Sequence, residues 1–303
     1  LLASGRRLED CRGGQAHLAG LGPQESESGV ATDLRAVEVQ VGGMIISWWS
    51  AGVTSAVATK LAIDKYGKDR VLPIYFHIDT AHPDNERFIR ECEDWYGRDI
   101  MMTKSHKHNN QFEVITKDKY VNGPGGARCT LVLKKRVRQR IEKEMNYEAQ
   151  IFGFEYSKKE VNRAIRFKEQ YPDAKPIFPL IEKKLTKPEC LYYLEQAGIK
   201  RPTMYTLGYG NNNCIGCVKG GKGYWNKIRQ DFPEYFQRMA DAEREVGNSC
   251  IRGVYLDELQ DREGAQQKFV MPDCGNFCDI EFSDIMHKNI DEIMREPEQL
   301  SLF

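Results

Sequence analysis

The segment from Ser50 to Ser55 (Ser-Ala-Gly-Val-Thr-Ser) combines small residues with hydroxyl groups, between a strand pattern over 44–49 and a helix pattern over 53–66. At such a junction several backbone N–H groups and the helix N-terminus converge on one point, which favours an anion. The small residues let a phosphate approach the backbone, and the hydroxyl groups add donors. We therefore predict a phosphate-binding loop formed by Ser50, Ala51, Gly52, Val53, Thr54 and Ser55.

Cysteines form the second candidate site. Cys214 and Cys217 are separated by two residues in a loop rich in glycine and asparagine. Two thiolates at this spacing can hold one metal ion or one corner of an iron–sulfur cluster, and a redox pair or plain free thiols are the alternatives. The chain has nine cysteines, an odd number that favours thiols or metal ligands over a disulfide framework. We expect no chemical role for Cys11, Cys92, Cys190 and Cys250.

Alternating strand and helix patterns would position these residues. The strand patterns cover 44–49, 71–78, 99–103, 149–154 and 176–180, and the helix patterns cover 53–66, 83–97, 130–145, 158–170 and 186–198. This repetition predicts an α/β fold with a Rossmann-like, mainly parallel five-stranded sheet and helices on both faces. Ligands of such sheets bind beyond the carboxyl ends of the strands, where the phosphate-binding loop and Asp79 would lie.

Composition divides the chain into three expected parts. Residues 1–43 contain no Lys, Ile, Met, Phe, Tyr or Trp, so we expect an extension that is disordered or not native to the protein. Residues 44–210 form the expected nucleotide-binding domain, and the long polar segment 106–128 is predicted to be a mobile loop over its site. Residues 211–303 form a cysteine-containing loop and a helical region, with a helix pair over 224–246 as a lid or dimer surface.

Charge and hydropathy narrow the classes of partner. Lys plus Arg and Asp plus Glu each number 44, so the net charge does not point to nucleic acid or to a membrane surface. The longest apolar runs are too short to span a bilayer, and the first residues lack a continuous apolar signal region. We expect a cytoplasmic protein, with a homodimer as one option and a nucleic-acid partner allowed but not indicated.

Four further blocks, in a fixed order, resemble one known family. The chain is similar to the phosphoadenosine phosphosulfate (PAPS) reductase family of the adenine nucleotide alpha hydrolase superfamily, whose pyrophosphate loop (PP-loop) reads Ser-Gly-Gly-x-x-Ser. Ala51 replaces the first glycine of that loop, and its methyl could crowd a phosphate. The resemblance covers about 44–225 and is carried by 50–55, by Asp79-Thr80 (family Asp-Thr), by 128–138 (Cys-Cys-x-x-x-Lys), by 178–209 (Pro-Leu…Gly-Ile…Pro…Tyr…Gly-Tyr) and by 214–217 (Cys-x-x-Cys).

The resemblance implies an iron–sulfur cluster, probed here against the cysteines of this chain. Iron–sulfur members carry a Cys-Cys pair before the Cys-x-x-Cys, and in this chain Cys129 occupies the second place while Arg128 replaces the first. Cys274 or Cys278 could complete the set, or one iron could stay open, and four thiolates would also suit zinc. The expected ligands, for a cluster of 4Fe-4S type, are Cys129, Cys214, Cys217 and Cys278.

The resemblance also implies catalytic and nucleotide-binding residues. Asp273-Cys274-Gly275 is similar to the Glu-Cys-Gly tail that carries the nucleophilic cysteine of sulfonucleotide reductases, and Lys134 matches the family's lysine after the cysteine block. Cys274 and Lys134 are therefore the expected catalytic residues. Glu155 stands where the family often has Arg, which argues against a standard 3′-phosphate pocket. Besides the loop, the expected nucleotide-binding residues are Asp79, Thr80, Lys135 and Arg163.

Three functions fit these observations. The first is a sulfonucleotide reductase-like enzyme that takes an adenylyl sulfate and uses a thiol reductant such as thioredoxin. The second is an ATP-dependent, iron–sulfur thiolation enzyme that adenylates a nucleic-acid base, with Mg²⁺ on the pyrophosphate and a cysteine desulfurase as sulfur source. The third is a catalytically inactive nucleotide- or metal-binding module, which Ala51 and Glu155 would favour.

Overall fold

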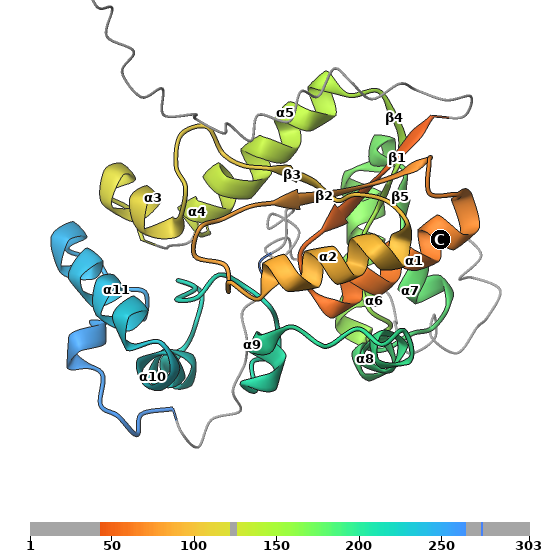
Figure 1. Ribbon diagram of the computed structural model, residues 1–303. Coiled ribbons are helices and arrows are strands. Elements are labelled where there is room, and N and C mark those ends of the chain that lie inside the picture. Colours follow the sequence, from red (N-terminus) through yellow and green to blue (C-terminus); the bar gives the residue numbers. More distant parts are fainter. Residues whose placement is uncertain (1–42, 122–125, 265–273, 275–303) are drawn as a thin grey trace, which may run out of the picture. The chain divides into compact units, whose positions relative to one another are not determined.

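The computed structural model describes residues 43–121, 126–264 and 274 (Figure 1). Its five strands form one parallel sheet in the order β3-β2-β1-β4-β5. The strands are β1 (Met44–Trp49), β2 (Val71–Phe76), β3 (Met101–Thr103), β4 (Tyr147–Ile151) and β5 (Pro176–Ile177). The predicted fold class is confirmed, with the reversal of strand order between β1 and β4.

The central strand β1 is buried along its whole length because helices cover both faces of the sheet. Its two tryptophans point to opposite faces, since side chains alternate along a strand. Trp49 belongs to the apolar cluster of one face and Trp48 to that of the other. A continuous apolar run such as 44–49 is therefore what this position in the sheet requires.

Helices pack on each face of the sheet. The Trp49 cluster includes residues of α1 (Val53–Tyr66), α2 (Asn85–Tyr96) and α8 (Lys187–Gln196), whereas the Trp48 cluster includes residues of α5 (Arg136–Glu144) and α6 (Lys158–Gln170). Figure 1 shows α5 on one side of the sheet and α1, α2 and α8 on the other. The predicted coverage of both faces is confirmed.

Local signals explain where several helices begin and end. Helix α8 begins at a capping box in which Thr186 and Glu189 each bond the other's backbone N–H. Helix α2 ends at Gly97, whose φ of 61° is the left-handed conformation that glycine adopts without a steric cost. The predicted strand 176–180 is shorter than expected, because Pro179 starts the short helix α7 (Pro179–Glu182).

The prediction of a loop throughout 106–128 is wrong. This segment contains α3 (Gln111–Asp118), which begins where the Asn110 side chain accepts a hydrogen bond from the Glu113 backbone N–H at 3.0 Å. The helix forms because Phe112 and Ile115 bury their side chains in an apolar cluster. The polar residues on its outer face concealed that periodicity.

The helix predicted over 130–145 is composite. It consists of α4 (Arg128–Thr130), a π-helical turn (Leu131–Lys135) and α5. Such π-helical turns occur frequently at functional sites, because one extra residue in the turn re-aims the side chains around it. Lys134 and Lys135 both lie in this turn.

The helical region after the sheet contains the predicted helix pair. Helices α9 (Thr203–Thr206), α10 (Lys222–Asp231) and α11 (Pro233–Val246) contribute to a third apolar cluster, together with α3. Trp225 and Tyr224 of α10 are fully buried in it. Residues 1–42, which include nearly all of the predicted extension, lie outside the described residues. No helix of the described segments is long and apolar enough to cross a membrane.

Candidate functional site

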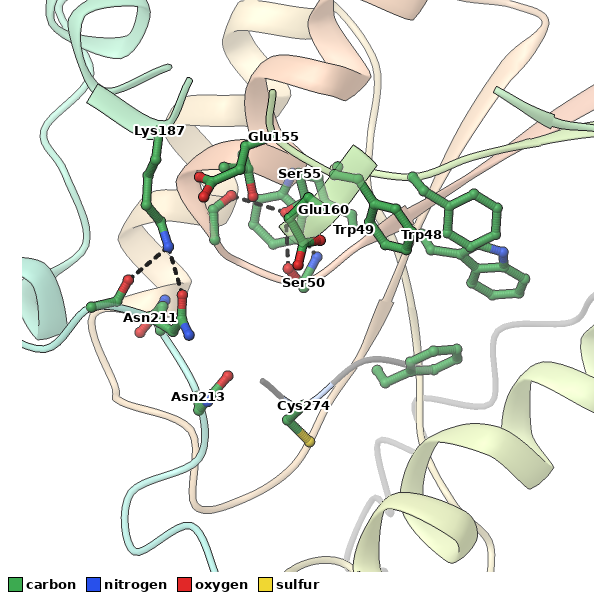
Figure 2. Close-up of a pocket in the computed structure, with 18 of the residues that line it drawn as sticks. Trp48, Trp49, Ser50, Ser55, Glu155, Glu160, Lys187, Asn211, Asn213 and Cys274 are labelled. Carbon is green, nitrogen blue, oxygen red and sulfur yellow. Dashed lines mark hydrogen bonds between the residues drawn. The ribbon is translucent and has the colours of Figure 1, made fainter. Parts of the chain in front are cut away.

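A cavity of about 330 Å³ lies at the carboxyl ends of β1 and β4. Three segments line it: the loop after β1, the residues 152–155 after β4, and the loop 210–214 that leads to the Cys-x-x-Cys pair. The strand order of the sheet reverses between β1 and β4, and parallel sheets bind ligands at such a switch point. Figure 2 shows Ser50 and Ser55 on one side of this cavity and Cys274 across from them.

The loop after β1 is held in a compact turn by its own hydroxyl groups. Ser55 Oγ accepts from the Ser50 backbone N–H at 3.1 Å and donates to the Gly52 carbonyl oxygen at 2.9 Å. The Ser50 hydroxyl also donates to Ser55 Oγ at 3.0 Å. Ser50, Gly52, Thr54 and Ser55 line the cavity at the N-terminus of α1. This is the geometry of a phosphate-binding loop.

Ala51 lies differently from the rest of the loop. It is fully buried, belongs to the apolar cluster around Trp49, and is not among the residues that line the cavity. Its φ of 58° is in the left-handed region, where a Cβ atom is unfavourable. The expected crowding of a phosphate by the Ala51 methyl therefore has no counterpart in this geometry.

The segment after β4 packs directly against the loop. A Cβ atom at Gly153 would lie 2.7 Å from the backbone N and Cα of Ser55, which no side chain can tolerate. Glycine at this position thus lets the two segments form adjoining walls of the cavity. Glu155, two residues further on, also lines the cavity. Its Oε2 atom is buried without a hydrogen-bond partner among the described residues.

The opposite end of the cavity is lined by Lys134, Cys214 and Cys274. Cys214 and Cys274 also line a second, smaller cavity, together with Cys129 and Cys217. Apolar side chains, including Ile78 and Leu133, complete the walls of this second cavity. Three of the predicted metal ligands and the predicted nucleophile are thus brought together, while Cys278 lies outside the described residues.

The donor set suits a cluster better than a single metal ion. Within the described residues, no three His, Cys, Asp or Glu side chains are close enough to hold one ion. Thiolates around an iron–sulfur cluster bind different iron atoms and stand further apart, and the apolar walls would shield the cluster from water. Cysteines converging on one apolar cavity therefore fit an iron–sulfur group, and they favour it over the zinc alternative.

Charge distinguishes the four thiols of this cavity. Burial, together with Cys274 and Cys214, raises the pKa of Cys129 to about 12. Burial also works to raise the pKa of Cys274, but the positive charges of Lys134 and Lys219 outweigh it and hold this pKa below its ordinary value. The Cys274 thiol lies 3.7 Å from Thr130 Oγ1. Cys274 is accordingly the thiol that ionises most readily among them.

Not every predicted nucleotide-binding residue reaches the cavity. Asp79, Thr80 and Lys135 are not among its lining residues. Thr80 is buried and hydrogen-bonds to Gln111, and Asp79 Oδ1 lies 3.4 Å from His77 Nε2. Arg163 does line the cavity, where it pairs with Glu160 at 3.3 Å and lies 4.4 Å from the centre of the Phe154 ring.

Arg128, which replaces a family cysteine, is bound elsewhere. Its Nε donates to Asp118 Oδ2 at 2.8 Å, so the side chain closes an ion pair at the end of α3. Cys250, for which no role was expected, is brought near the cysteine cavity: burial raises its pKa, and the charges of Glu243, Cys217 and Cys129 add to this effect. No sequence spacing linked Cys250 to that site.

The sequence reasoning also missed polar residues of the cavity wall. Lys187 donates to the Gly210 carbonyl oxygen at 2.8 Å and to Asn211 Oδ1 at 2.6 Å, as Figure 2 shows for Asn211. Asn212 and Tyr205 line the cavity as well. The run of three asparagines before Cys214 was the available signal for this wall, because amides so close to a Cys-x-x-Cys pair must lie near its site.

Fold and site together define a nucleotide-binding α/β protein whose switch-point cavity adjoins a cluster of cysteines. A model of the phosphoadenosine phosphosulfate reductase domain matches residues 44–221, a range that includes the phosphate-binding loop and the Cys-x-x-Cys pair. The chain therefore belongs to the PAPS reductase family, and the family assigns it to enzymes of nucleotide-related sulfur chemistry. No curated protein matches the chain.

Proposed function

We propose that the protein is a sulfonucleotide reductase-like enzyme that takes an adenylyl sulfate as its substrate. The observation that carries this proposal is the single cavity lined by Ser50 and Ser55 at one end and by Lys134 and Cys274 at the other. The phosphate of the nucleotide would lie on the loop. Its sulfate would then lie beside a positive charge and a thiol of lowered pKa.

In this reaction the Cys274 thiolate attacks the sulfur atom of the sulfate. A sulfur–sulfur bond forms, the bond from sulfur to the bridging oxygen breaks, and AMP leaves with the electron pair. The product on the enzyme is a thiosulfonate. Lys134 would stabilise the charge on the sulfate oxygens, and the loop N–H groups and hydroxyls would hold the phosphate of the leaving AMP.

A dithiol of the thioredoxin class would complete the turnover. Its first thiolate attacks the Cys274 sulfur, sulfite leaves with the electron pair, and a mixed disulfide forms. Its second thiol resolves that disulfide and restores the Cys274 thiol. The dithiol is oxidised by two electrons while the sulfate is reduced to sulfite.

Cys129, Cys214 and Cys217 are the residues that would hold an iron–sulfur cluster of 4Fe-4S type, since they share the apolar cavity beside Cys274. The cluster, when bound, would tune the electrostatic field around the sulfate. Its fourth ligand is open: Cys278 lies outside the described residues, and one iron atom could instead keep a free position.

ATP-dependent thiolation is the second candidate, and Glu155 is the observation that favours it. A carboxylate in the wall next to the phosphate-binding loop repels a bare phosphosulfate, but it suits phosphates that carry Mg²⁺. The buried, unpartnered Oε2 of Glu155 would then gain a cation partner. In that scheme the loop would bind the pyrophosphate that leaves when AMP is transferred to the substrate.

Turnover of two nucleotides tests the proposal. Enzyme purified without oxygen is given adenylyl sulfate, with and without a 3′-phosphate, plus a dithiol, and sulfite and AMP are measured. Release of both in equal amounts supports the reductase, and loss of sulfite in Cys274→Ser but not in Cys92→Ala supports the nucleophile. Cys92 is buried in the sheet core and lines neither cavity, so it controls for a lost buried thiol. Pyrophosphate from ATP without any sulfite would instead favour thiolation.

A further inference from the structure

The phosphate-binding loop contains a residue in an unfavourable backbone conformation. Ala51 has a φ of 58°, where its Cβ atom crowds the following carbonyl oxygen. The family loop resembled by 50–55 has glycine at this position, and glycine adopts this conformation without that cost. Another part of this chain must therefore hold Ala51 in place.

Asn212 makes the contact that does so. Its Nδ2 donates to the Ala51 carbonyl oxygen at 2.7 Å and to Asn85 Oδ1 at 2.7 Å. Asn85 in turn donates from Nδ2 to the Tyr75 hydroxyl at 3.2 Å. Asn212 and Asn85 are both buried, with 9% and 6% of their surfaces exposed. A buried hydrogen bond on a fixed anchor is strongly orienting, because breaking it would leave the carbonyl unsatisfied.

The orientation matters for the next residue. The Ala51 carbonyl and the Gly52 N–H belong to one planar trans peptide, so they point in opposite directions. Asn212 binds the carbonyl side, and Gly52 lines the cavity on the other. Fixing the carbonyl thus fixes the direction in which the Gly52 N–H is presented to a phosphate.

We propose that Asn212 is a positioning residue that holds the Ala51–Gly52 peptide in the geometry needed for phosphate binding, in place of the glycine that adopts it unaided. The inference rests on the proposed binding of an adenine nucleotide at this loop. Asn212 precedes Cys214 by two residues, so the loop that carries the cysteine pair also holds the phosphate-binding loop.

A double-mutant cycle with Ala51→Gly tests this proposal. The affinities of ATP and of adenylyl sulfate are measured by calorimetry for the wild type, Asn212→Ala, Ala51→Gly and the double variant. Asn212→Ala should weaken binding roughly tenfold, the effect of one lost buried hydrogen bond. The double variant should bind within about threefold of Ala51→Gly, because glycine no longer needs the support.

Two further variants keep the test decisive. Asn212→Asp keeps the size of the side chain but removes the donor, and it should weaken binding like Asn212→Ala. Asn226→Ala is the matched control: Asn226 Nδ2 donates to two backbone carbonyls, of Gln260 and Glu263, and the residue does not line the cavity. It should lower the free energy of unfolding and leave nucleotide affinity unchanged.

The outcomes separate the inference from the proposed function. Wild-type affinity in Asn212→Ala and Asn212→Asp, or a loss that Ala51→Gly does not recover, would overturn the role of Asn212 alone. A wild type that binds neither nucleotide would overturn nucleotide binding at the loop, and the inference with it.

Discussion

The ammonium group of Lys134 donates a hydrogen bond to the main-chain carbonyl oxygen of Cys274 at 3.2 Å, although 140 residues separate the two in sequence. Lys134 lies in a π-helical turn and Cys274 in a distant part of the chain, yet both line the same cavity. Burial works to lower the pKa of Lys134, but the charges of Cys274 and Cys214 outweigh it and raise this pKa. A positive charge is thereby kept at the cysteine end of the cavity.

Removal of this charge should slow turnover. We predict that Lys134→Met lowers kcat for adenylyl sulfate by about 10²–10³-fold, because charge on the sulfate oxygens is no longer stabilised. Steady-state sulfite release gives the measurement. Lys143→Met, which removes a lysine from exposed surface near the end of α5, should change kcat little. Equal kcat values for Lys134→Met and the wild type would exclude this role.

Substitution of Gly153 should disturb the phosphate-binding loop. Gly153→Ala places a methyl 2.7 Å from the Ser55 backbone, so we expect a loss of about 1–3 kcal/mol in unfolding free energy, as for other overpacked sites. Nucleotide affinity should fall as well, since Ser55 must move. Denaturant unfolding and calorimetry measure the two effects. Gly221→Ala is the control, because a Cβ there meets no atom within 4 Å; similar behaviour of both variants would contradict the packing argument.

Asp84 should make stability depend on acid pH. Its carboxylate accepts two hydrogen bonds from Arg87 and one from the Thr203 backbone N–H, and these hold its pKa at about 2. Because this pKa is lower in the folded chain, the stabilisation is present above the ordinary aspartate value and is lost as pH falls from about 5 towards 2.

The variant Asp84→Asn measures that contribution. We expect it to lower the free energy of unfolding by about 1–2 kcal/mol at pH 7, after allowance for solvent screening. The difference from the wild type should shrink steadily in urea titrations at pH 7, 4 and 3. A difference that stays constant with pH would assign the loss to packing and not to the Asp84 charge.

The cysteine cavity predicts which substitutions remove iron. Cys129→Ser and Cys217→Ser should each lower the iron and acid-labile sulfide of anaerobically purified protein and bleach its visible absorption. Cys92→Ser should retain both, because Cys92 is buried in the sheet core and lines neither cavity. Wild-type protein that stays colourless after reconstitution would refute the cluster proposal.

Much of the fold could be predicted because strand and helix patterns alternate regularly along the sequence. The two tryptophans of β1 were placed on opposite faces by alternation alone. Helix α3 escaped prediction because Gly and Pro residues near 123–126 and polar neighbours suggested a loop, whereas tertiary packing of Phe112 stabilises a helix.

The site was predictable only where it depends on local sequence. The loop at Ser50 and the Cys214–Cys217 pair are contiguous motifs, and the structure brings both to the cavity region. The bond between Asn212 and Ala51 spans 161 residues, and no local pattern encodes such a contact. Asp79 follows β2 as expected, but the reversal of strand order places the cavity beyond β1 and β4.

Trapping of the covalent intermediate tests the central claim most directly. Enzyme reduced and then freed of reductant is incubated with adenylyl sulfate labelled with ³⁵S, and its peptides are analysed by mass spectrometry. The account predicts a thiosulfonate on Cys274, formed in equal amount with AMP and released as labelled sulfite when a dithiol is added. Nucleotide binding without label on Cys274, or label on another cysteine, would contradict it.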